Sequence, residues 1–197
     1  MQTGFTVPLP EKRIASNGVF GMIFVLATEA MFFAGLISAY MVNRANEMML
    51  PPAGQPRLPV EATALNTLVL LASAYTLYRF RQKYMADGSV QGKSTSMLIT
   101  SIALGVIFLA VQGSEWLRLI SFGLTTHSSI YGAFFYTLIG LHGVHVLAGI
   151  LILLYLWYTI KGLKSHEDAG NRIAVCSMYW YFVVAVWPVL YYLVYLS

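Results

Sequence analysis

Residues 130–160 read IYGAFFYTLIGLHGVHVLAGILILLYLWYTI and contain no Asp, Glu, Lys or Arg. A helix needs about 20 predominantly apolar residues to cross the roughly 30 Å of hydrocarbon in a lipid bilayer. This stretch is longer than that, and no charge interrupts it. It therefore predicts a transmembrane helix.

Four more apolar stretches lie on either side of this one. Proline-rich, polar or charged connections separate them, and none of these connections is long enough for a soluble domain. We therefore predict an all-α fold, an integral membrane bundle of five transmembrane helices that forms a single domain over residues 1–197. The predicted helices cover about residues 18–42, 62–78, 97–116, 130–160 and 174–196.

The composition excludes a water-soluble domain. Hydrophobic residues make up 58% of the chain and charged residues only 10%, whereas ordinary soluble domains carry about 25% charged residues. The single cysteine, Cys176, excludes an internal disulfide, and the sequence lacks the Cys and His spacing of a zinc site. The first residues do not follow a signal-peptide pattern, so we expect the first apolar stretch to stay in the membrane.

The distribution of Lys and Arg predicts the orientation, because cytoplasmic loops of membrane proteins are enriched in positive charge. With the N-terminus inside, nine of the 12 Lys and Arg residues lie on the cytoplasmic side, and only Arg44, Arg57 and Arg118 lie outside. The C-terminus is then outside. The net charge of +4 thus reflects topology, and we infer no nucleic-acid partner from it.

One acidic residue, Glu29, lies near the middle of the first predicted helix. An ionisable side chain inside a bilayer costs at least a few kcal/mol and needs a reason to be there. Two interpretations stay open, a carboxyl group that fixes helix packing and a group that takes part in proton handling. In both, the carboxyl group needs a hydrogen-bonding partner.

Two histidines, His142 and His145, are three residues apart and share one face of the fourth predicted helix. Haem ligation is disfavoured, because two ligands of one haem stand on opposite sides of the iron and the remaining histidines, His127 and His166, fall in connections on opposite sides of the membrane. We favour hydrogen bonding between helices, with Glu29 as a partner. Three small residues nearby would let another helix approach closely: Gly140, Gly143 and Gly149.

Other polar residues are predicted to be structural. Glu61 precedes the second helix and Glu115 ends the third, so both are expected near the outer interface. Asn66, Ser73 and Gln112 are candidates for hydrogen bonds between helices. The sequence contains no Walker loop, Rossmann fingerprint or hydrolase triad.

Five short sequence motifs follow one another along the chain. They are TEAMFFAG at 28–35, which contains Glu29, LNTLVLLAS at 65–73, QGSEW at 112–116, YGAFF at 131–135 and GLHGVHV at 140–146. Together they resemble subunit III of the haem-copper terminal oxidases, the cytochrome c oxidase type, in its short five-helix bacterial form. The resemblance extends from Phe20 to Leu196.

The resemblance implies a component of a respiratory oxidoreductase complex that is not itself catalytic. Such a chain holds no haem, copper or other metal, packs beside subunit I, which holds haem and copper and pumps protons, and assembles with subunit II and others in the bacterial cytoplasmic (inner) membrane. In the family this subunit supports proton uptake, protects the catalytic subunit from inactivation and binds phospholipid.

The resemblance also implies roles for individual residues. By position, Glu29 matches the family's buried carboxyl group, with His142 and His145 as its neighbours in the bundle. At the predicted cytoplasmic surface, a loop before the last helix carries groups that either buffer protons or are merely solvated: His166, Glu167 and Asp168.

The last helix departs from the family pattern, because Tyr181 replaces a histidine and Val184 replaces an aspartate. No role is transferred to these two positions. The chain also has no counterpart of the two N-terminal helices of seven-helix members, and a neighbouring subunit is one source of them.

Two other functions stay open. One is the matching subunit of a quinol oxidase or a nitric oxide reductase assembly, since the electron donor binds to other subunits. The other is an independent proton-coupled carrier that uses Glu29 and the histidine pair. A carrier is typically built with broken helices near the midplane, for which Pro188 is the only sign.

Overall fold

The computed structural model describes residues 17–45, 60–87, 93–127, 130–160, 162 and 166–196. These residues form five long α-helices and a short π-helix, and no strand occurs among them. The elements are α1 (Asn17–Ala45), α2 (Val60–Asp87), α3 (Lys93–Ser121), α4 (Ile130–Ile160), α5 (His166–Tyr191) and η1 (Tyr192–Leu196). All five α-helices are long and apolar enough to cross a membrane. The predicted all-α, five-helix membrane fold is confirmed.

Several helices extend beyond the apolar stretches that predicted them. The largest extension is in α2, which continues to Asp87 through Arg79, Arg81 and Lys83. Arg, Lys and Gln favour helix, and no Gly or Pro interrupts the sequence before Gly88. The helix therefore outlasts the apolar stretch, because hydrophobicity marks only the part that crosses the hydrocarbon.

The start of α5 corrects a prediction. His166, Glu167 and Asp168 were expected in a loop, but they form the first turn of α5. Acidic side chains at this position interact favourably with the positive end of the helix dipole. The apolar pattern missed this turn because it begins only after Arg172.

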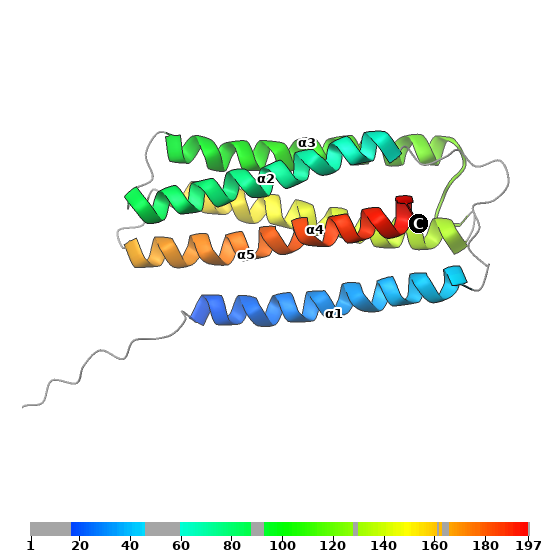
Figure 1. Ribbon diagram of the computed structural model, residues 1–197, viewed down its shortest axis with the longest axis horizontal. Coiled ribbons are helices and arrows are strands. Elements are labelled where there is room, and N and C mark those ends of the chain that lie inside the picture. The colour runs from blue at the N-terminus through cyan, green and yellow to red at the C-terminus, as the bar shows by residue number, and fades with distance from the viewer. Residues whose placement is uncertain are drawn as a thin grey trace, which may run out of the picture.

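The helices run back and forth along one axis, with α1 at the side of the bundle next to α5 (Figure 1). Helix α2 packs along α3, and α4 packs against both α3 and α5, whereas α1 contacts α5 and only touches α4. Only Phe33 and Tyr40 of α1 are buried. Helix α1 is therefore peripheral within this chain.

The end of α1 is attached to the end of α5. Arg44 Nη1 donates a hydrogen bond to the carbonyl oxygen of Leu193 (3.0 Å), and the Tyr40 hydroxyl donates to the same oxygen (3.3 Å). Leu193 belongs to η1, and the last carbonyl groups of a helix need donors from outside it. These two bonds fix one end of α1.

Polar side chains join the other helices in the core, as the sequence predicted. The three predicted residues all bond to another helix: Asn66 Nδ2 donates to the carbonyl oxygen of Phe108 (3.0 Å), Ser73 Oγ accepts from Trp180 Nε1 (3.2 Å), and Gln112 Nε2 donates to the hydroxyl of Tyr195 (3.0 Å).

Close helix packing occurs at two of the three predicted glycines. A Cβ atom on Gly143 would lie 2.7 Å from the Trp116 ring, and one on Gly149 would lie 2.7 Å from the Trp180 ring. Such distances leave no room for a side chain. The prediction was wrong for Gly140, which has no neighbouring atom within 4 Å of that position.

Candidate functional site

A hydrogen bond between α1 and α4 joins Glu29 to His145. Glu29 Oε2 lies 2.9 Å from His145 Nε2, and the two side chains are 29% and 15% exposed, respectively. The predicted partnership between the buried acid and the histidine pair is therefore confirmed for His145. It is the polar link that holds the otherwise loosely packed α1 at mid-helix.

The contact made by the other ring nitrogen of His145, Nδ1, constrains which atom can donate in the hydrogen bond between Nε2 and Glu29. His145 Nδ1 is 2.7 Å from the carbonyl oxygen of Leu141. A carbonyl oxygen can only accept, so Nδ1 carries a hydrogen and donates it. Nε2 then either accepts from a protonated Glu29 or, in an imidazolium, donates to the carboxylate. In both cases one proton lies between Glu29 Oε2 and His145 Nε2, and the pair is neutral overall.

An aromatic residue packs against this pair. Phe33, one helical turn after Glu29, meets the His145 ring edge to face with 5.1 Å between ring centroids. Phe33 is 3% exposed. It therefore covers one side of the imidazole with hydrocarbon, and Glu29 is the more accessible member of the pair.

His142 does not join the pair, although the sequence predicted that it would. It is 1% exposed, its ring stacks on Trp187 with 4.9 Å between centroids, and neither ring nitrogen has a hydrogen-bond partner within the described residues. Three residues along a helix correspond to a rotation of about 60°. That rotation directs His142 toward α3 and α5 and His145 toward α1.

The remaining predicted residues lie toward the two ends of the bundle, away from the Glu29–His145 pair. Glu61 is exposed in the first turn of α2. Glu115 is 9% exposed, and its carboxylate lies 3.4 Å from Arg118 Nη1. Glu167 and Asp168 are exposed at the start of α5. Among the described residues, no three His, Cys, Asp or Glu side chains converge as a metal site.

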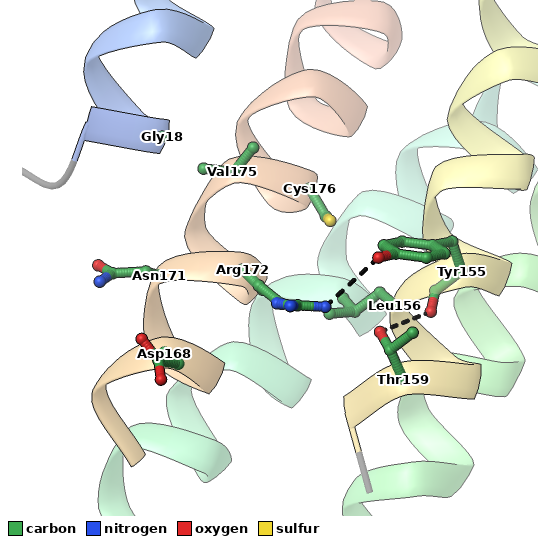
Figure 2. Close-up of a pocket in the computed structure, with 9 residues that line it drawn as sticks. All are labelled: Gly18, Tyr155, Leu156, Thr159, Asp168, Asn171, Arg172, Val175 and Cys176. Atoms are coloured by element: carbon green, nitrogen blue, oxygen red, sulfur yellow. Dashed lines mark hydrogen bonds between the residues drawn. The ribbon is translucent and has the colours of Figure 1, made fainter. Parts of the chain in front are cut away.

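A groove that the sequence did not predict lies where the start of α1 meets the end of α4 and the start of α5. Figure 2 shows Arg172 of α5 extending toward Tyr155 of α4, whose hydroxyl accepts a hydrogen bond from Arg172 Nη1 (3.4 Å). The cavity measures about 470 Å³ and is open on one side. Its lining combines polar and apolar side chains with one glycine: Gly18, Tyr155, Leu156, Thr159, Asp168, Asn171, Arg172, Val175 and Cys176.

The sequence contained only part of the signal for this groove. Asp168 and Arg172 are four residues apart, which places them on one helical face. The two residues share a face only if the helix already includes Asp168, and the apolar pattern did not predict that α5 begins so early. The opposite wall comes from α4, and only the tertiary structure brings the two together.

Comparison with known proteins decides the family. The family model described as cytochrome c oxidase subunit III matches residues 11–197, nearly the whole chain. The chain belongs to the cytochrome c oxidase subunit III family. Membership implies a multi-pass membrane protein that forms a complex with other oxidase subunits.

Individual relatives of this family member agree with the match. It is 34% identical over 179 residues to cytochrome c oxidase subunit 3 of Synechocystis, covering 90% of this chain and 75% of the relative. It is 30% identical to cytochrome c oxidase subunit 3 of Thermostichus vulcanus, with coverages of 90% and 86%. It is 34% identical to cytochrome c oxidase subunit 3 of Corynebacterium diphtheriae, with coverages of 89% and 85%.

Two residues of α5, Tyr181 and Val184, depart from the sequence pattern expected for this subunit III. Val184 is 4% exposed among apolar residues, and Tyr181 is partly buried in the same helix. The Val184 side chain cannot form a hydrogen bond, so it contributes to the bundle through apolar packing alone. Among the described residues, the contact between an acidic side chain and a histidine of another helix is the one between Glu29 and His145.

Proposed function

We propose that this chain is a non-catalytic subunit of a cytochrome c oxidase that packs against subunit I and supports proton uptake, stability and lipid binding during oxygen reduction. The observation that carries the proton role is the 2.9 Å contact between Glu29 Oε2 and His145 Nε2, with His145 Nδ1 held at 2.7 Å from the Leu141 carbonyl oxygen. Family membership supports the assembly, in which the partner subunits would hold the haem and copper and this chain would hold none.

The pair suits proton uptake because it can hold a proton without a net charge in the membrane. Moving the proton from Oε2 to Nε2, 2.9 Å apart, converts a neutral acid and imidazole into an adjacent carboxylate and imidazolium, so the net charge of the pair stays zero. A further proton would give a protonated carboxyl group beside an imidazolium. Because Glu29 is the more exposed partner, we propose that it exchanges protons with groups outside the chain.

The test replaces Glu29 by Gln in the assembled oxidase. The Gln amide can donate to His145 Nε2, so the complex should assemble, but an amide does not exchange protons as a carboxyl group does. Proton uptake during turnover, measured from about pH 6 to about pH 9, should be slower than in wild type. Thr28→Ala is the control, because the Thr28 hydroxyl is exposed and bonds only within α1. Unchanged kinetics in Glu29→Gln would reject the proton role.

We further propose that the groove in Figure 2 holds a phospholipid. Leu156, Val175 and Cys176 offer an apolar wall to an acyl chain, and Arg172 offers a guanidinium to the phosphate. Asp168, one turn away, would favour a headgroup that also carries an ammonium. Arg172→Gln should reduce the phospholipid retained by the purified complex, whereas Arg118→Gln at the other end of the bundle should not. Equal lipid retention in both variants would contradict a lipid site.

Surface roles are proposed for the remaining predicted residues. Glu167 and Asp168 are exposed at the start of α5, with His166 in the same turn, and together they are candidate proton-buffering groups. At the other end, Glu61 and Glu115 are candidate contacts to partner subunits. The predicted orientation, with the N-terminus in the cytoplasm of a bacterium, would place the buffering groups on the side from which protons are taken up.

Purification through a tag on this chain tests the assembly. In mild detergent, a haem-copper subunit I should co-purify and give the complex a haem spectrum, and its companions would distinguish a cytochrome c donor from a quinol. Isolation of a colourless chain from intact, cross-linked membranes would instead favour the independent carrier, which transport assays on Glu29 variants would then test.

A further inference from the structure

The end of α2 that extends past its apolar stretch carries three cations within five residues, Arg79, Arg81 and Lys83. Arg79 is exposed, and the other two are partly exposed. No carboxylate among the described residues pairs with them, since the ion pairs there join Arg118 to Glu115 and His145 to Glu29. The only acid on this part of α2 is its last residue, Asp87.

Two hollows flank this segment and share Gln82 and Ala86. One, of about 250 Å³, is lined by Arg79 and Lys83 together with Met97 of α3. The other, of about 520 Å³, is lined by Tyr78, Arg81 and Met85. Each hollow therefore combines at least one cation with a methionine side chain, which is apolar and adapts its shape to its surroundings.

Neighbouring tyrosines hold two of the polar side chains in place. Arg79 Nη1 donates to the Tyr75 hydroxyl (3.1 Å), and the Arg79 guanidinium carbon lies 6.0 Å from the centre of the same ring. Gln82 Nε2 donates to the Tyr78 hydroxyl (2.5 Å). Tyrosine is typical of the membrane–water interface. The donors are thus partly ordered before any ligand binds.

We propose that this end of α2 binds the phosphate headgroup of an anionic phospholipid. The side chains at positions 79 and 83 are neighbours on the helix surface, and a guanidinium beside an ammonium can contact two oxygens of one phosphate. Met97 then contacts the first carbons of an acyl chain. Basic pockets beside transmembrane helices favour anionic lipids. This site lies on a different helix from the groove of Figure 2, and three cations outnumber its one acid.

The experiment compares lipid binding by the intact, delipidated oxidase complex in native mass spectrometry. The probes are phosphatidylglycerol and phosphatidylcholine with the same acyl chains. Wild type should bind phosphatidylglycerol more tightly than phosphatidylcholine. Arg79→Gln/Lys83→Gln should bind phosphatidylglycerol about fivefold to thirtyfold more weakly, since each interfacial cation contributes roughly a factor of five. Arg118→Gln is the matched control and should bind like wild type.

Three results would overturn the proposal. The first is equal binding of the two lipids by wild type, and the second is unchanged phosphatidylglycerol binding in the double variant. The third is loss of a protein subunit from the double variant with lipid binding unchanged, which would show that the cations contact an acidic protein surface. If the double variant does not assemble, Arg79→Gln alone should show about a fivefold loss, and the charge-conserving variant Arg79→Lys/Lys83→Arg should keep most of the binding.

Discussion

Replacing Glu29 by Ala should destabilise this chain in the oxidase complex more than replacing it by Gln. Gln keeps a donor within reach of His145 Nε2, which lies 2.9 Å from the present carboxyl oxygen. Ala removes the partner and leaves the imidazole nitrogen, on a side chain that is only 15% exposed, without a hydrogen bond. It also removes the side-chain atoms that fill the space between α1 and α4.

The size of the difference follows from the geometry. A hydrogen bond between membrane helices contributes about 0.6–2 kcal/mol, and leaving a buried polar atom unpaired costs about 1–3 kcal/mol. Glu29 is 29% exposed, so part of the lost interaction can be replaced by surrounding groups. We therefore expect Ala to be about 1–2 kcal/mol less stable than Gln. For a chain of this size that corresponds to roughly 2–8 °C in the unfolding midpoint.

The assay is thermal release of this chain from the purified complex, followed for wild type, Glu29→Gln, Glu29→Ala and the control Thr28→Ala. His145→Ala and the double variant Glu29→Ala/His145→Ala complete a double-mutant cycle with Glu29→Ala, which isolates the pairwise energy. The Ala variant should be released at the lowest temperature of the three position-29 proteins. Equal midpoints for Gln and Ala, or additive effects in the cycle, would refute the contribution of this contact to stability.

Three further predictions concern other contacts. His142→Gln should leave the haem absorption bands of the assembled complex unchanged, because His142 stacks on Trp187 within this chain; a shifted Soret band would indicate ligation. Gly149→Val should lower stability by about 1–3 kcal/mol, because a Cβ there meets the Trp180 ring at 2.7 Å, whereas Gly140→Ala, with nothing within 4 Å, should be tolerated; similar thermal midpoints would contradict this packing. Arg44→Gln should speed hydrogen exchange near the end of α1, because it removes the 3.0 Å bond to the Leu193 carbonyl; unchanged exchange would show that this bond does not hold the helix.

The stability and proton tests address different properties of the same pair. A Gln at position 29 preserves the hydrogen bond but removes the exchangeable carboxyl proton. Normal assembly with slow proton uptake would therefore support both proposals, whereas normal assembly with normal uptake would leave Glu29 a packing residue. That outcome corresponds to the structural alternative that the sequence left open.

The sequence by itself determined the fold class and the number of helices. A bilayer requires long apolar segments, so hydrophobicity read along the chain is enough to find them. The predicted range 130–160 agrees at both ends with α4. It also indicated that Glu29 needed a partner, because a polar group in hydrocarbon is costly alone. The ends of α2 and α5 were less predictable, because helix propensity continues after hydrophobicity stops.

Only the tertiary structure decided which groups meet. The choice of His145 over His142 depends on the rotation of α4 relative to α1, and the roles of Gly143 and Gly149 depend on which tryptophan faces them. The groove beside Arg172 depends on three helices at once. Hydrophobicity is nearly the same all around a membrane helix, so it specifies the span but not the neighbouring helix, and packing between side chains settles the rest.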